Sequence, residues 1–153
     1  MANTYHQIYI QTVFAVKFRE ALILPAFRRE LFGYIGATIN QLGHKTILIN
    51  GIADHVHCFI GLNPKQALSD LMREVKANAS GWVNKNKFLK HRFEWQEGFG
   101  AFSYGKSQVD SVYKYIENQE EHHNQVTFRE EYLSLLRKFE VEHNEKYVFK
   151  EPE

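Results

Sequence analysis

The most regular pattern in the chain lies at residues 53–62, which read Ala53-Asp54-His55-Val56-His57-Cys58-Phe59-Ile60-Gly61-Leu62. Here apolar residues from Val56 to Ile60 alternate with His55, His57 and Phe59, and this period of two predicts a β-strand. Because side chains two residues apart point to the same face of a strand, the two imidazoles lie side by side. The alternating apolar side chains then press into a core on the opposite face.

Two imidazoles preset on one face of a rigid strand suit a divalent metal, with the other coordination positions left for further groups. The H-x-H pattern is short, however, and histidines on the solvent face of a strand fit it as well. The interpretation of His55 and His57 as metal ligands therefore depends on further ligands elsewhere in the chain.

The elements on either side of this strand follow from changes in hydrophobic period. A strand at 45–52 is close enough in sequence to pair with it as a β-hairpin. The other elements are expected as a strand at 6–16, a helix from Pro25 to a C-terminal cap at Gly43, a helix that opens at Asn63-Pro64-Lys65-Gln66 and carries its apolar stripe from Leu68 to Val83, a strand at 93–104, and helices at about 107–123 and 127–140.

This order is β-α-β-β-α-β-α-α. The first six elements predict a ferredoxin-like sandwich of the α+β class, in which two helices cover one face of an antiparallel βαββαβ sheet. The two additional C-terminal helices are then available for function on the other face. At 153 residues the chain is interpreted as a single domain spanning 1–153.

Composition limits the classes of function. The formal net charge is +1, so any nucleic-acid surface has to be local. The single cysteine, Cys58, excludes an intrachain disulfide and fits a reducing compartment. There is neither a signal peptide pattern nor an apolar run long enough to span a membrane. We expect a cytoplasmic protein with neither a membrane partner nor a small-molecule substrate.

The expected helix at 107–123 carries the second set of chemical groups. At about 100° per residue, Tyr115 and Gln119 lie roughly 40° apart, one turn from each other. Tyr113 is the competing tyrosine, but it points to the far side. His122 and His123 either complete a metal site or simply favour the negative end of the helix dipole.

Together, His55, His57 and Gln119 would give two imidazoles and an amide oxygen, a set that favours Mg²⁺ or Mn²⁺ and leaves positions open for catalysis. Tyr115 would be the nucleophile that attacks a phosphodiester and forms a phosphotyrosine bond. A free phenol has a pKa near ~10, so it needs help from the metal or a neighbour. The alternative is that Tyr115 is an amphipathic packing residue.

The combination resembles the single-tyrosine HUH transposases of the two-hundred/six-hundred-and-five insertion-sequence family, also called REP-associated tyrosine transposases. His55-Val56-His57 resembles the HUH motif. The stretch from Tyr115 to His123, Tyr-Ile-Glu-Asn-Gln-Glu-Glu-His-His, resembles the catalytic helix. The resemblance extends over nearly the whole chain, including residues 95–102 and 127–131.

This resemblance implies a metal-dependent enzyme of DNA transposition and recombination that cuts and rejoins single-stranded DNA with hairpin ends. It implies Tyr115 as nucleophile and His55, His57 and Gln119 as ligands of Mg²⁺ or Mn²⁺. It further implies a homodimer with two hybrid sites, in which Tyr115 of one chain meets the histidines of the other.

Two other functions compete with transposition. A non-catalytic single-stranded nucleic-acid-binding module would stack bases on aromatic side chains such as Tyr5, Tyr9 and Phe14. The basic run at 85–92 would also suit single strands, although such a run is usually a solvated loop. An HUH nickase of replication or conjugation shares the chemistry but normally belongs to a larger chain.

Overall fold

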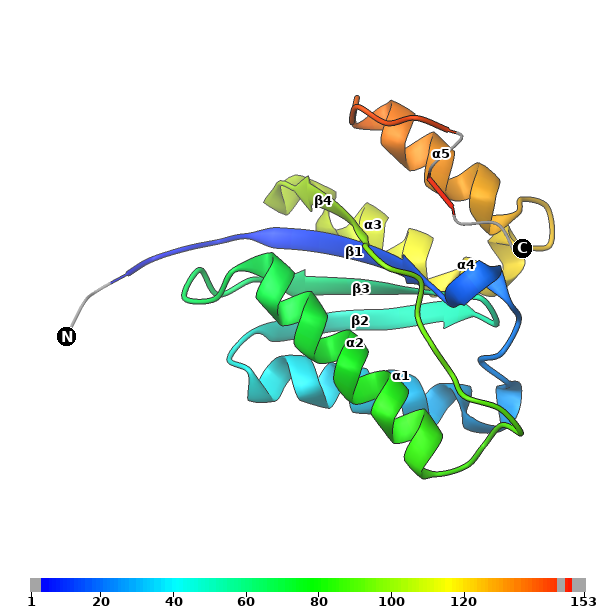
Figure 1. Cartoon of the computed structure of the whole chain (residues 1–153). Coiled ribbons are helices and arrows are strands. Elements are labelled where there is room, and N and C mark those ends of the chain that lie inside the picture. The colour runs from blue at the N-terminus through cyan, green and yellow to red at the C-terminus, as the bar shows by residue number, and fades with distance from the viewer. Residues whose placement is uncertain (1–3, 146–147, 150–153) are drawn as a thin grey trace.

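The computed structural model describes residues 4–145 and 148–149. A four-stranded antiparallel sheet lies at its centre, with the strand order β2-β3-β1-β4. Helices α1 and α2 cover one face of this sheet, and α3 and α5 lie on the opposite face (Figure 1). This is the ferredoxin-like arrangement with additional C-terminal helices that the sequence predicts.

The strands are β1 (Tyr9–Ala15), β2 (Lys45–Ile52), β3 (His55–Gly61) and β4 (Gly100–Tyr104). β2 and β3 form the expected β-hairpin, with a bulge in the register between Thr46 and Leu48. β3 also pairs with β1, so it is a central strand flanked on both sides. The histidine strand is therefore held by two backbone ladders, which gives its side chains a rigid base.

The core between the sheet and the first two helices follows the alternation in the sequence. Val56, Cys58 and Ile60 point into it and are at most 1% exposed. Helix α1 (Pro25–Gln41) begins at the proline, as expected, and α2 (Leu68–Lys85) lies beside it. Gly43 has a φ of 94°, the left-handed conformation expected after the end of a helix.

The opposite face of the sheet carries α3 (Val109–Glu117), the short α4 (Gln119–His122) and α5 (Phe128–Lys138). Val112 and Ile116 of α3 pack on Phe59 of β3. A separate cluster packs α5 against Val13 and Phe102. Among the described residues, none of these helices or the earlier ones is long and apolar enough to cross a membrane.

The expected strand at 93–104 is wrong in its first half. Only Gly100–Tyr104 forms a strand, and Trp95 makes a single bridge to Val16. The Lys76 ammonium of α2 donates to the carbonyls of Gln96 and Gly98, so this segment follows the helix rather than extending the strand.

Two expected helix boundaries also change. Helix α2 begins at Leu68, because the Asn63 side chain accepts from the Lys65 amide and caps a local turn instead. The expected helix at 107–123 is broken at Asn118. The Asn50 side chain of β2 donates to the carbonyls of Ile116 and Glu117, which ends α3 there.

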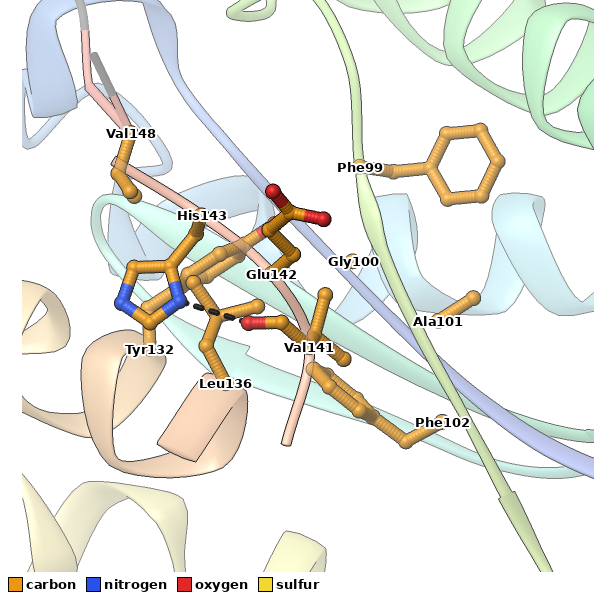
Figure 2. A pocket seen from close by; sticks show the side chains of 10 residues that line it. All are labelled: Phe99, Gly100, Ala101, Phe102, Tyr132, Leu136, Val141, Glu142, His143 and Val148. Carbon is orange, nitrogen blue, oxygen red and sulfur yellow. Dashed lines mark hydrogen bonds between the residues drawn. The ribbon is translucent and has the colours of Figure 1, made fainter. Parts of the chain in front are cut away.

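Residues that follow α5 lie near β4 and help to line an open pocket of about 280 Å³ (Figure 2). Its walls come from residues 99–102, from Tyr132 and Leu136 of α5, and from residues 141–143 and 148. In Figure 2 a hydrogen bond joins the His143 ring to the Val141 carbonyl. None of the site residues predicted from the sequence lines this cavity.

Candidate active site

The two histidines of β3 form the floor of the candidate active site. Both rings are fully buried, and their centroids are 5.0 Å apart. His55 Nδ1 lies 2.8 Å from Asp54 Oδ1, and His57 Nδ1 lies 2.8 Å from Gln11 Oε1. Because each Nδ1 already has a partner, both Nε2 atoms are left to face the helices above, as in histidines that bind metals.

Gln119, at the start of α4, brings its amide oxygen to these imidazoles. Gln119 Oε1 lies 3.0 Å from His55 Nε2 and 3.1 Å from His123 Nε2. The break at Asn118 does not separate Gln119 from the site, since its side chain is fully buried there. The structure thus brings the predicted His55, His57 and Gln119 together.

Tyr115 of α3 lies at the edge of the same cluster. Its ring centroid is 5.9 Å from that of His57, and its hydroxyl donates to Glu131 Oε2. Tyr113 is exposed and absent from these contacts, in agreement with the prediction that it points away. Tyr115 therefore lies next to the histidine pair of its own chain, whereas the family resemblance implies a tyrosine that meets the histidines of a partner chain.

Glu131 of α5 is a site residue that the sequence reasoning missed. Its Oε1 lies 3.1 Å from His57 Nε2, 3.1 Å from His123 Nε2 and 3.4 Å from His55 Nε2. The signal was present: Glu131 falls on the buried stripe of α5 with Phe128 and Leu135, where an acidic residue is unusual.

The neighbouring histidines have different places. The His123 side chain is 3% exposed, with Nδ1 2.6 Å from the Val126 carbonyl and Nε2 directed at Glu131 and Gln119. His122 is 37% exposed and lies 3.4 Å from Glu131 Oε2. Both therefore belong to the cluster, His123 inside it and His122 at its rim.

The charges of the cluster are strongly coupled. Burial opposes the imidazolium of His55, but Asp54 and Glu131 outweigh it and raise the pKa of His55 to about 9. Burial lowers the pKa of His57. Burial alone would raise the pKa of the Glu131 carboxyl, yet hydrogen bonds from the three buried histidines hold it well below its ordinary value. The Glu131 carboxylate is thus ionised at neutral pH.

The same surroundings keep the Tyr115 phenol protonated. Burial and the adjacent negative charge of Glu131 both raise the pKa of Tyr115 above its ordinary value. A neutral phenol is a poor nucleophile, so attack by Tyr115 requires a nearby positive charge to offset that of Glu131.

The donor set fits a divalent cation. His55 and His57 offer imidazole nitrogens, and Gln119 and Glu131 offer oxygens, a mixture that Mg²⁺ or Mn²⁺ accepts. The separations of 3.0 to 3.4 Å between these nitrogen and oxygen atoms match the ~3.0 Å expected between neighbouring ligands of an ion with bonds of about 2.1 Å.

A cavity of about 240 Å³ gives access to the tyrosine side of the site. Its lining includes Gln11, Tyr104, Tyr115 and Lys138. Tyr104 accepts a hydrogen bond from Gln11, whose oxygen in turn faces His57. This cavity therefore gives solvent access to Tyr115 and to Gln11, the partner of His57, and Lys138 is one of its lining residues.

A family model described as "Transposase IS200 like" matches residues 4–119, which is three quarters of the chain. The chain belongs to the IS200-like transposases. The matched part of this IS200-like transposase contains His55, His57, Tyr115 and Gln119, and it ends before His123 and Glu131. A comparison with curated protein sequences found no match.

Two solved structures share the fold of this IS200-like transposase. One, described as a candidate transposase of Deinococcus radiodurans, has a TM-score of 0.63 and 17% identity, with 78% of this chain and 95% of that chain covered. The other is a REP-associated tyrosine transposase bound to a REP hairpin. Its TM-score is 0.61 at 15% identity, with 100% of this chain and 93% of that chain covered.

Proposed function

We propose that this transposase cleaves and rejoins single-stranded DNA through a 5′-phosphotyrosine at Tyr115, with Mg²⁺ or Mn²⁺ held by His55, His57 and Gln119. The observation that carries the proposal is the position of the Tyr115 hydroxyl in one buried cluster with these three residues. Membership of the IS200-like family supports strand cleavage and transfer as the overall activity.

In the proposed step, the Tyr115 oxygen attacks a backbone phosphorus. A bond from this oxygen to phosphorus forms as the bond from phosphorus to the 3′ oxygen breaks. The phenol loses its proton, and the released 3′ oxygen gains a proton and becomes a hydroxyl. A cation bound by the cluster would withdraw electrons from a phosphate oxygen and offset the charge of Glu131. One phosphoester replaces another, so the reverse step can rejoin a strand without ATP.

The shape of the site favours a single strand as the substrate. The histidines, Gln119 and Glu131 are buried, and the cavity beside Tyr115 is about 240 Å³. A flexible strand can turn one phosphate into such a space more easily than a paired duplex can. Lys138 on the cavity wall supplies a phosphate-binding charge. The REP-associated relative is bound to a hairpin, which supports hairpin ends as the recognised element.

We further propose a homodimer, because strand exchange needs two DNA ends held together and a two-fold interface supplies two equivalent sites. We also propose that the protein acts in the cytoplasm. Each site would be complete within one chain, since Tyr115 lies beside its own His57.

The alternative of a non-catalytic binding module is weaker. Of its three proposed stacking residues, Phe14 is 1% exposed and lies in the core with α1 and α2, and only Tyr5 is exposed. An HUH nickase would use the same chemistry, but the family match favours transposition.

The test is a cleavage assay on DNA that flanks the gene of this protein. Labelled single strands that contain hairpins from that DNA, and the same sequences as full duplexes, are incubated with the protein and Mn²⁺. We expect cleavage of the single strands, with one product retained on the protein after denaturation. Preferential cleavage of the duplexes, or none of either form, would contradict the proposal.

A further inference from the structure

Glu131 is not among the three residues that the proposed function assigns as ligands of the cation, although its carboxylate lies in the same cluster. The carboxylate is 3% exposed, and its two oxygens face different groups. Oε1 points at the Nε2 atoms of His55, His57 and His123. Oε2 accepts hydrogen bonds from the Tyr115 hydroxyl and, at 3.0 Å, from Gln119 Nε2.

A buried carboxylate is costly unless it is fully compensated, so its presence here needs a reason. Helix α5 is built to hold it. The Thr127 side chain caps the helix by accepting from the Glu130 amide. The Phe128 ring stacks on His55, with centroids 4.1 Å apart and an interplanar angle of 14°. These contacts fix the first turn of α5 over the histidine pair and direct Glu131 inward.

The adjacent acid behaves differently. Glu130 is exposed and accepts from the Thr127 hydroxyl at 3.0 Å, which completes the cap. Of the two consecutive glutamates, Glu130 therefore caps the start of α5, and Glu131 contacts the histidine cluster. This difference also supplies a matched control one residue away.

We propose that Glu131 is a further ligand of the divalent cation through Oε1 and that through Oε2 it orients the Tyr115 hydroxyl. The inference rests on the proposed metal-dependent function and adds to it a residue from α5, beyond the part of the chain that the family model matches. One carboxylate then connects the cation site to the nucleophile and sets the distance between them.

The orientation of the Gln119 amide agrees with these separate roles of the two Glu131 oxygens. Its oxygen lies with the imidazole nitrogens, and its nitrogen donates to the Glu131 oxygen that also accepts from Tyr115. A carboxylate ligand would also offset part of the charge of the cation, which two imidazoles and an amide cannot do.

Mn²⁺ binding to the DNA-free protein tests the ligand role. Calorimetry measures the affinity of the wild type and of Glu131→Gln, which keeps the shape and removes the charge, with Glu130→Gln as the control. We expect Glu131→Gln to weaken Mn²⁺ binding by at least ~10-fold, because even the loss of a group that only hydrogen-bonds to a metal ligand typically costs about 10- to 100-fold. Glu130→Gln should stay within about twofold of the wild type.

Failure of the inference and failure of the proposed function give different results. If Glu131→Gln binds like the wild type while His55→Ala does not bind, Glu131 is not a ligand and the metal site stands. If the wild type itself does not bind Mn²⁺, the metal-dependent function fails and the role of Glu131 fails with it. Should Glu131→Gln not fold by circular dichroism, Glu131→Asp replaces it and is expected to bind Mn²⁺ more weakly than the wild type; equal affinity would overturn the ligand role.

The orienting role is tested at saturating Mn²⁺, where a ligand defect no longer limits the rate. We expect the single-turnover cleavage rate of Glu131→Gln to stay at least tenfold below the wild type under these conditions, because Tyr115 has lost the acceptor that fixes its hydroxyl. Full recovery of the rate would overturn this half of the proposal. Tyr115→Phe should retain wild-type Mn²⁺ affinity.

Discussion

His57 Nε2 lies 3.1 Å from Glu131 Oε1, although 74 positions separate the two residues in the chain. This contact joins the central strand β3 to the C-terminal helix α5 and closes the site over Gln119. The candidate active site of this IS200-like transposase is therefore built from three parts of the chain: the histidine strand, the segment from Tyr115 to His123, and α5.

Removal of the cation or of a histidine ligand should abolish cleavage. We expect no detectable cleavage by His55→Ala, by His57→Ala, or by the wild type in EDTA, since no divalent cation then withdraws electrons from the phosphate that Tyr115 attacks. His91→Ala, an exposed histidine near the end of α2, is the control and should remain active. The measurement is cleavage of a labelled hairpin strand, with circular dichroism to confirm folding. Undiminished cleavage in EDTA would disprove metal dependence.

Cation binding should weaken as the pH falls. Although burial opposes it, Asp54 and Glu131 raise the pKa of His55 to about 9, so this imidazole carries a proton at neutral pH when no metal is bound. Only the unprotonated ring binds a metal, so binding must release that proton. Calorimetry in buffers with different ionisation enthalpies should show proton release at pH 7 and lower affinity at pH 6. A pH-independent affinity from 6 to 9 would contradict this assignment.

Complementation distinguishes a site within one chain from a hybrid site. The family resemblance implies that Tyr115 acts on the histidines of a partner, whereas the structure brings it to its own His57. A mixture of Tyr115→Phe and His55→Ala chains, allowed to exchange subunits, should therefore stay inactive. Recovery toward about a quarter of the wild-type activity, from one working site in each heterodimer, would show that the tyrosine acts across the dimer.

Lys138 should contribute to the binding of the strand but not to its sequence preference. It is one of the residues that line the cavity beside Tyr115. Lys138→Ala is expected to lower single-strand affinity and to reduce the slope of log affinity against log salt by about one. Lys85→Ala, at the end of α2 on the opposite face of the sheet, is the control for charge. An equal loss of DNA affinity in both variants would indicate that the DNA strand binds elsewhere, for example on the basic run at 85–92.

Much of the fold follows from local sequence patterns. The alternation at 55–60 correctly predicts β3 and its two faces, and Pro25 marks the start of α1, because both depend on the residues of one element. The break at Asn118 could not be predicted, since it depends on Asn50 of β2 reaching the carbonyls at the end of α3. Such a contact exists only once the sheet and the helix are packed together.

The grouping of the candidate site residues was predictable to a similar extent. His55, His57, Tyr115 and Gln119 share short spacings that place them on common faces, and the structure brings them together. Glu131 lies in a different helix, so its approach to the histidines depends on how α5 packs. The sequence carried only the indirect sign of an acidic residue on an apolar stripe.

The most direct test is to find the atom to which the DNA becomes attached. The wild type is incubated with Mn²⁺ and a cleavable hairpin strand, the adduct is digested, and mass spectrometry locates the nucleotide on a peptide. We predict attachment at Tyr115, loss of the adduct in Tyr115→Phe with DNA binding largely kept, and an unchanged adduct in the exposed control Tyr113→Phe. An adduct that persists in Tyr115→Phe, or that maps to Tyr113, would contradict the account.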